Sequence, residues 1–95
     1  MPGYVIAEVD VTDPAAYEEY RKLVAPTIAK YGGRFLVRGG ACESLEGDWR
    51  PARVVVLEFP DVAAAKAWYG SQEYGPLIKV RQSAPRGHVI LVEGA

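Results

Sequence analysis

Two arginines in apolar surroundings are the residues of this sequence best suited to bind a charged ligand. Arg38 follows an apolar run and precedes two glycines, so its planar fork of donors could hold an anion where a ligand can approach the backbone closely. Arg81 shares a predicted helix face with two aliphatic residues, and it either extends past them to water or points into a polar pocket. The alternative for Arg38 is an ion pair with a carboxylate across the sheet or across a subunit boundary.

Aromatic residues are dense on the two predicted helices, where Tyr17, Trp68 and Tyr74 stand with two further tyrosines. Such side chains usually pack in a core and keep polar tips that need hydrogen-bond partners. The functional alternative is a pocket lined by these rings and by one or two arginines, which would suit a small aromatic or enol-type carboxylate as ligand. Trp49, in a long loop, either covers such a ligand or is buried against a partner subunit.

Three residues are candidates for proton transfer. Glu46 lies in the long loop, where it either offers and accepts a proton or stays solvated and pairs with Arg50. Tyr17 is a second candidate through its phenol, and His88 is the only side chain that ordinarily titrates near neutral pH. The single cysteine, Cys42, has no base beside it in the sequence, so we expect an inert loop thiol.

The composition argues against several classes of protein. One cysteine and one histidine cannot build the usual zinc site of three or four nitrogen and sulfur ligands, so we expect no metal, and we also expect no cofactor. Eleven basic and 12 acidic residues give a net charge of -1, which argues against nucleic-acid binding. The sequence has neither a signal-peptide pattern nor an apolar stretch of about 20 residues, so we expect a cytoplasmic protein without membrane contact. With 95 residues, we expect a single domain over residues 1–95.

The chain is expected to form six elements in the order β-α-β-β-α-β. Alternating apolar residues and helix-start signals at Asp13 and Asp61 define them, and Gly70 with Ser71 interrupts the second helix. This order predicts an α+β ferredoxin-like fold, with a four-stranded antiparallel sheet and both helices on one face. The predicted strands cover residues 4–11, 34–38, 53–59 and 88–93, the helices cover 14–31 and 62 to about 83, and residues 41–52 form the long loop.

The predicted sheet has one dry face and one mixed face. If Phe35 opposes Leu57, then Val37 opposes Val55 on the dry face that meets the helices. An exposed sheet face with much aliphatic surface usually marks an interface, so we expect a homodimer through the mixed face. A partner subunit would also add core to a chain this short. The mixed face is predicted to carry Ile6, Leu36, Val54, Val56, Glu8, Arg34, Arg38 and Glu58.

Several blocks of residues carry a resemblance to a known family. They are Tyr17 to Tyr20 before Pro26, residues 31–40 (YGGRFLVRGG), residues 45–49 (LEGDW), Glu58 with Phe59, residues 67–69 (AWY) with Ser71 and Tyr74, and Arg81. On these blocks the sequence resembles the domain of unknown function 1330 family (DUF1330), within the dimeric α/β-barrel superfamily. The resemblance implies a ferredoxin-like fold and a homodimer in which two sheets face each other as a barrel. It implies no catalytic residues.

Three functions compete at this point. The preferred one is a small cofactor-independent enzyme that acts on a small anionic or aromatic metabolite in a pocket between helices and sheet, with Arg38 or Arg81 holding the anion. The alternative is a non-catalytic homodimeric binding or assembly module, in which the same residues form core and interface. RNA-recognition domains share the β-α-β-β-α-β order, but they place stacking aromatic residues on the central strands, where this chain has valines and a glutamate.

Overall fold

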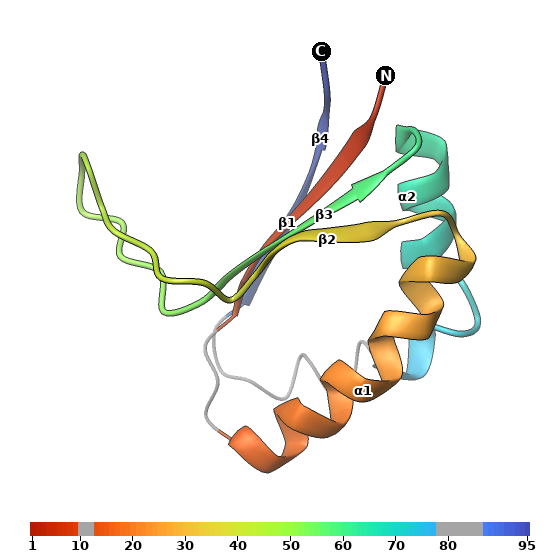
Figure 1. The fold of residues 1–95 in the computed structure, drawn as a ribbon, viewed down its shortest axis with the longest axis horizontal. Helices are drawn as coiled ribbons and strands as arrows, with labels where there is room; N and C mark the ends of the chain where they lie inside the picture. The colour runs from red at the N-terminus through yellow and green to blue at the C-terminus, as the bar shows by residue number, and fades with distance from the viewer. Residues whose placement is uncertain (10–12, 78–86) are drawn as a thin grey trace.

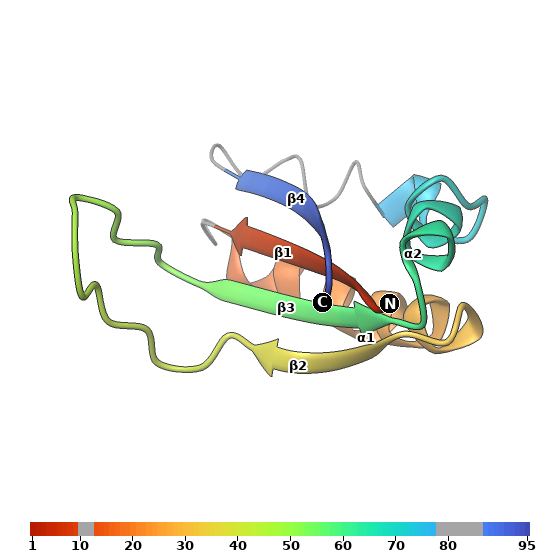
Figure 2. The ribbon, with the colours of Figure 1, turned by 90° about the horizontal axis from the view of Figure 1, so that it is seen from above.

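The computed structural model describes residues 1–9, 13–77 and 87–95. The predicted order of elements is confirmed, and the four strands form one antiparallel sheet in the order β2-β3-β1-β4. Both helices lie on the same side of this sheet, which gives the α+β ferredoxin-like fold (Figures 1 and 2). The elements are β1 (Gly3–Val9), α1 (Pro14–Lys30), β2 (Arg34–Arg38), β3 (Val54–Phe59), α2 (Val62–Tyr69) and β4 (Gly87–Glu93).

Both helices begin where the sequence predicts, because an aspartate precedes each first turn. The Asp13 carboxylate accepts a hydrogen bond of 3.2 Å from the backbone N–H of Ala16, and Asp61 accepts one of 2.7 Å from Ala64. Each carboxylate satisfies a backbone N–H that has no partner within its own helix. After α1 the chain turns at Gly32, whose φ of +80° favours glycine over residues with a side chain.

The predicted interruption of the second helix is present at Gly70, where α2 ends. Ser71 caps the next turn, because its hydroxyl accepts a hydrogen bond of 3.1 Å from the backbone N–H of Tyr74. The predicted continuation to about residue 83, and with it Arg81, lies outside the described residues. No helix in the described ranges has the length and apolar character needed to span a bilayer.

The hydrophobic core lies between the helices and the inner face of the sheet. Phe59, Ile28 and Tyr74 are the largest of its fully buried side chains, and each comes from a different segment of the chain. Trp68 is also buried, with its ring centroid 5.4 Å from that of Phe59. Burial of apolar side chains from strands and both helices therefore holds the two layers together. The whole cluster comprises Val5, Val24, Ile28, Leu57, Phe59, Ala65, Trp68, Tyr74 and Leu77.

A β-bulge in β2 changes the predicted pairing of the central strands. Phe35 opposes Leu57 as predicted, but Val37 opposes Val56 and not Val55, so the second half of that prediction is wrong. One extra residue in β2, between Phe35 and Val37, shifts the register. Arg38 therefore opposes Val55 and lies on the helix side of the sheet, and not on the mixed face where the sequence pattern placed it.

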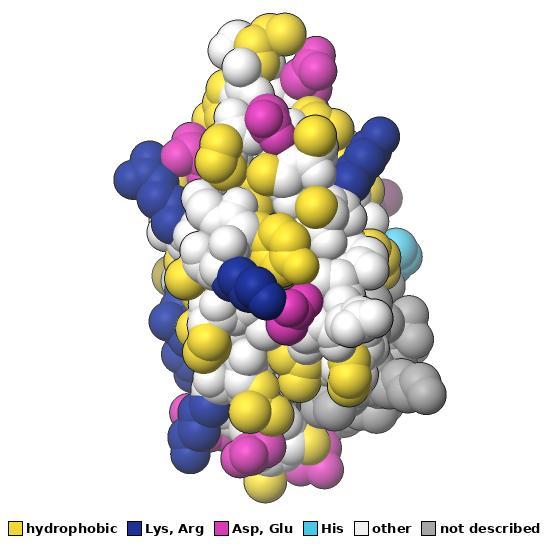
Figure 3. Space-filling model, turned by 90° about the vertical axis from the view of Figure 1, so that its right-hand side faces the viewer, with side chains coloured by type: hydrophobic (Ala, Val, Ile, Leu, Met, Phe, Trp, Pro, Cys, Tyr) yellow, Lys and Arg dark blue, Asp and Glu magenta, His cyan; other side chains and the backbone are white. Residues whose placement is uncertain are grey.

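The other face of the sheet has no helix over it in the described parts of the chain (Figure 2). Ile90, paired with Ile6, is 55% exposed there, and Val37 is 40% exposed. Arg34 and Glu58 form an ion pair of 2.8 Å on the same face. This open face is mixed in character, as the sequence predicts. The side of the molecule that carries α2 and the end of α1 also shows hydrophobic side chains scattered among charged ones (Figure 3).

We predict that the tight packing of core side chains from α1 and β3 against Gly33 makes Gly33→Ala destabilising. A Cβ atom there would lie 2.6 Å from Phe59 Cε1 and 2.8 Å from Ile28 Cγ2, and both of these side chains are fixed in the core. We expect a loss of about 1–3 kcal/mol in the free energy of unfolding, measured with urea at one protein concentration.

Gly40→Ala is the matched control, because no atom lies within 4 Å of a Cβ atom built there. Its free energy of unfolding should stay the same or rise by about 0.4–1 kcal/mol, because alanine restricts the unfolded chain. Equal stability of the two variants would contradict the packing described around Gly33.

Candidate functional site

A cavity of about 40 Å³ lies between the inner face of the sheet and the helices. Its walls are mostly aliphatic and aromatic, and they come from all four strands, both helices and the turn that follows α2. Four of the residues singled out in the sequence line it together: Tyr17, Arg38, Trp68 and Tyr74. The fold thus brings one arginine and three aromatic side chains, distant in sequence, to the same enclosed space.

Trp68 and Tyr74 form the aromatic wall of the cavity. Their ring centroids are 4.1 Å apart, and the Trp68 indole N–H donates a hydrogen bond of 3.0 Å to the hydroxyl of Thr27 on α1. The Tyr74 hydroxyl lies 3.0 Å from the hydroxyl of Tyr20, also on α1. The polar tips of both rings therefore have partners on α1, which fixes the orientation of the ring faces.

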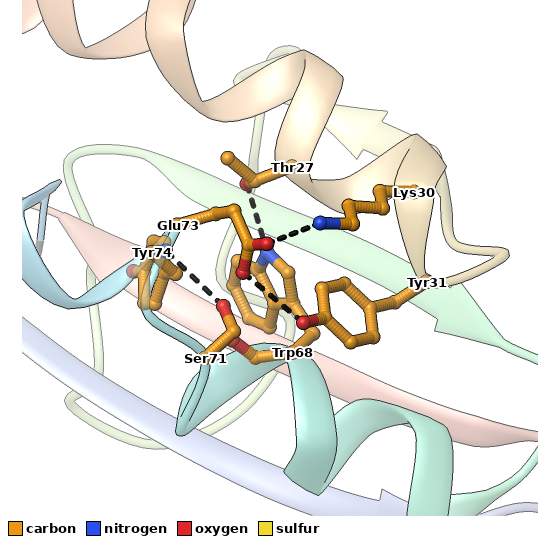
Figure 4. Close-up of polar contacts among 7 residues, drawn as sticks. All are labelled: Thr27, Lys30, Tyr31, Trp68, Ser71, Glu73 and Tyr74. Carbon is orange, nitrogen blue, oxygen red and sulfur yellow. Dashed lines mark hydrogen bonds and ion pairs between the residues drawn. The ribbon is translucent and has the colours of Figure 1, made fainter.

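The turn that carries Tyr74 is held to α1 by a small polar cluster (Figure 4). Glu73 accepts a hydrogen bond of 3.1 Å from the Tyr31 hydroxyl and forms an ion pair with Lys30. The hydrogen bond from Lys30, with further ones from its own backbone N–H and Tyr31, lowers the pKa of Glu73 from 4.5 to about 2. The cluster is partly exposed, so its main effect is to position the turn.

Arg38 lines the cavity from the sheet side. Its guanidinium carbon lies 4.3 Å above the centre of the Phe35 ring, a cation–π contact. It forms no ion pair with any other residue in the described ranges, so the carboxylate partner considered as the alternative is not found within this part of the chain. The bulge in β2 is the reason that this charge faces the helices.

Two further arginines lie near the cavity and were not singled out in the sequence. Arg21 on α1 is one of the lining residues. The Arg53 guanidinium carbon lies 5.1 Å from the centre of the Tyr17 ring. Helical spacing could have revealed Arg21, because it stands four residues after Tyr17 and three before Val24, within the apolar stripe of the helix. No comparable signal exists for Arg53, which lies just before β3.

The other predicted site residues lie elsewhere. Trp49 donates an indole hydrogen bond to Glu8 on the open face of the sheet, and His88 Nδ1 lies 3.1 Å from the same carboxylate. Both contacts lower the pKa of Glu8, and the hydrogen bond from Trp49 has the larger effect. Glu46 is exposed and lines a surface hollow of the long loop together with Arg50. This loop projects away from α2 (Figure 1). Of the three candidates for proton transfer, Glu46 and His88 therefore lie away from the cavity, and Tyr17 lines it.

The sequence matches one family model over almost its whole length. The model is that of the Domain of unknown function (DUF1330), and it covers residues 2–95. The chain belongs to this family. The resemblance inferred from the residue blocks is thereby confirmed, while a search of curated proteins finds no match.

Solved structures share the fold at low sequence identity. A protein of unknown function from Rhodopseudomonas palustris has a TM-score of 0.79 and 23% identity, over 99% of this chain and 82% of that one. A dimeric ferredoxin-like protein of unknown function from Jannaschia sp. CCS1 has a TM-score of 0.74 and 16% identity, over 99% and 100% of the two chains. SnoaB, a cofactor-independent oxygenase from Streptomyces nogalater, has a TM-score of 0.61 and 17% identity, over 99% and 92%.

We predict that the Glu73 cluster contributes to stability in a defined range of acidic pH. A carboxylate with a lowered pKa stabilises the fold fully above its unfolded value, here 4.5, and this contribution is lost as pH falls toward about 2. In Lys30→Met the Glu73 pKa should rise, so the free energy of unfolding should fall less steeply between these two pH values than in the wild type.

The measurement is urea unfolding at a series of pH values from about 2 to about 6, which covers the interval between the folded pKa of about 2 and the unfolded value of 4.5. Lys66→Met on α2 is the control, since no ion pair joins Lys66 to another described residue. Parallel stability curves for the wild type and Lys30→Met would contradict the assignment.

Proposed function

We propose that this protein is a homodimer that binds a small organic anion in the cavity between helices and sheet, and that it acts on this ligand as an enzyme without a cofactor. The observation that carries the proposal is Arg38, an exposed residue whose charge has no carboxylate partner in the described ranges and which lines a cavity whose other walls, apart from Arg21, are aliphatic and aromatic. A few polar groups in a mostly apolar cavity are typical of small-molecule sites.

The cavity volume favours a short acid over an aromatic one. A buried water molecule requires a cavity volume of about 10–15 Å³, so a cavity of about 40 Å³ holds about three water molecules. Protein cavities that bind benzene are larger, at about 150 Å³. A ligand of a few non-hydrogen atoms therefore fits without rearrangement. An aromatic acid would require side chains such as the half-buried Tyr17 and Arg21 to move.

The groups available for chemistry at the cavity are phenols. Tyr17 lines it directly, and the paired hydroxyls of Tyr20 and Tyr74 belong to its wall. Tyrosine hydroxyls can donate a proton or a hydrogen bond to a ligand oxygen, which suits proton-transfer chemistry on a carbonyl acid. The related fold of a cofactor-independent oxygenase from Streptomyces nogalater supports the view that such a scaffold can work without a cofactor.

The open sheet face supports the homodimer. Four aliphatic side chains on β2 and β4 are exposed there by 40% or more, and a ferredoxin-like protein with the same fold is dimeric. Trp49 and its contact with Glu8 lie on this face, so the loop would become part of the subunit contact. The exposed aliphatic residues are Leu36, Val37, Ile90 and Val92.

A non-catalytic binding or assembly module remains the second candidate function. The separation of Glu46 and His88 from the cavity favours it, because these are two of the three predicted proton carriers; only Tyr17 lines the cavity. Both candidates share the homodimer, and they differ in whether the cavity ligand is converted to a product.

We predict that propionate binds in the cavity and that Arg38→Met weakens its binding about tenfold or more, as expected for the loss of a hydrogen bond to a charged group. The measurement uses the two indole N–H signals in a nitrogen-15 NMR titration. The Trp68 signal reports on the cavity wall, and the Trp49 signal, on the open face, serves as the internal control.

Arg50→Met in the loop is the matched variant and should bind as the wild type does. Propionate that shifts neither indole, or that shifts only Trp49, would refute the cavity as its binding site.

We predict that Ile90→Lys on the open face dissociates the dimer at micromolar concentration, measured by sedimentation velocity, because a lysine there would be buried without a partner. Leu23→Lys is the control, since Leu23 is exposed to a similar extent (49%, against 55% for Ile90) but lies on α1. Trp49→Ala should weaken the dimer by a smaller factor. A wild-type monomer, or a Leu23→Lys variant that dissociates equally, would contradict the proposed interface.

A further inference from the structure

Arg21 has a buried nitrogen without a hydrogen-bond partner in the described parts of the chain. This nitrogen is Nε, and the residue lines the cavity. Its Nη1 lies 3.3 Å from Glu18 in an exposed ion pair, so only one part of the guanidinium is paired. A buried charged donor without an acceptor is costly and rare. An anion in the cavity would supply the missing acceptor.

Arg38 faces the same cavity from the sheet, while Arg21 faces it from α1. No aspartate or glutamate is found among the described residues that line the cavity. The two positive charges are therefore not balanced within the cavity wall, and an apolar wall weakens the screening of charges by water. Such a site favours anions over neutral molecules of the same shape.

Arg53 supports the same end of the cavity without lining it. Its guanidinium lies over the Tyr17 ring, and its backbone carbonyl accepts a hydrogen bond of 3.0 Å from Val9 at the end of β1. The chain leaves room for it at Gly39, where a Cβ atom would lie 2.4 Å from Arg53 Nη1. Arg53 is thus a positioning residue for Tyr17 and adds a third positive charge nearby.

We infer that Arg21 and Arg38 together bind the carboxylate of a short-chain organic acid. This inference rests on the proposed function, and it adds the charged group of the ligand and the residue on α1 that holds it. A planar guanidinium can donate two parallel hydrogen bonds to a planar carboxylate, so donors from α1 and β2 can engage both oxygens. The hydrocarbon part of the acid would then contact the Trp68 side of the cavity.

The test compares propionate with propionamide, which has nearly the same shape but no charge, at matched ionic strength. The Trp68 indole signal is followed in the wild type, Arg21→Met, Arg21→Lys and Lys22→Met. We expect propionate to bind the wild type about tenfold or more tightly than propionamide does. Arg21→Met should lose this preference, Arg21→Lys should keep part of it, and Lys22→Met, at the neighbouring exposed position, should keep all of it.

The thermal stability of the free protein gives a second readout. Because Arg21→Met removes a buried donor without an acceptor, its midpoint of unfolding should equal or exceed that of the wild type, which a purely structural role for Arg21 would not produce. Equal binding of acid and amide, or an acid preference that survives Arg21→Met, would overturn this inference and leave the proposed function standing. A wild-type Trp68 signal that responds to neither ligand would overturn both.

Discussion

The contacts of Trp68 are the interaction on which the rest of the structure depends. Its ring lies against Phe59 of the sheet and Tyr74 of the following turn, and its indole N–H is bonded to Thr27 of α1. One side chain thus joins the sheet and both helical segments, and it also forms part of the cavity wall. The core and the candidate site are therefore continuous, so a change at the centre of the core alters the shape of the cavity.

Polarity is distributed unevenly along this interior. Near Ile28 and Phe59 the layers meet mainly through apolar side chains, which pack closely around Gly33. Toward the other end of α1 the half-buried Arg21 and the exposed Arg38 line the cavity beside this core. Positive charge beside an apolar core lowers the stability of the free protein. A bound ligand of opposite charge would restore the lost stability. The arrangement of the core is in this way connected to the proposed binding of an acid.

The sequence predicts the fold well because its signals are local. Asp13 and Asp61 mark the helix starts, and period-two alternation marks the strands. The pairing of β2 could not be read in the same way, because Phe35, Leu36 and Val37 are consecutive apolar residues without alternation and the bulge is determined by contacts with β3. Glu46 and Trp49 lie in a loop without periodic sequence pattern, so the sequence could not predict that they lie away from the cavity.

Of the residues singled out in the sequence, Tyr17, Arg38, Trp68 and Tyr74 line one cavity, whereas Trp49 lies on the open face of the sheet. Helical spacing could have revealed that Arg21 lies in the apolar stripe of α1. The sequence does not show, however, whether such a charged side chain points into a cavity or extends along its stem to water. Only its surroundings in three dimensions separate the two cases, since they show that Nε is buried without an acceptor in the described ranges.

The irregularity in β2 has a broader consequence for how this strand can change. In a regular strand the parity of a position determines which layer it faces, and a single inserted or deleted residue reverses that parity for everything beyond it. In this chain Phe35 and Arg38, three positions apart, share a side. If β2 paired regularly with β3 at its present length, these two positions would face opposite sides and the guanidinium would turn away from the cavity, with no substitution of any cavity residue. Gain or loss of a single bulge in a strand of five residues is thus a route by which a scaffold of this kind gains or loses an ionic ligand site.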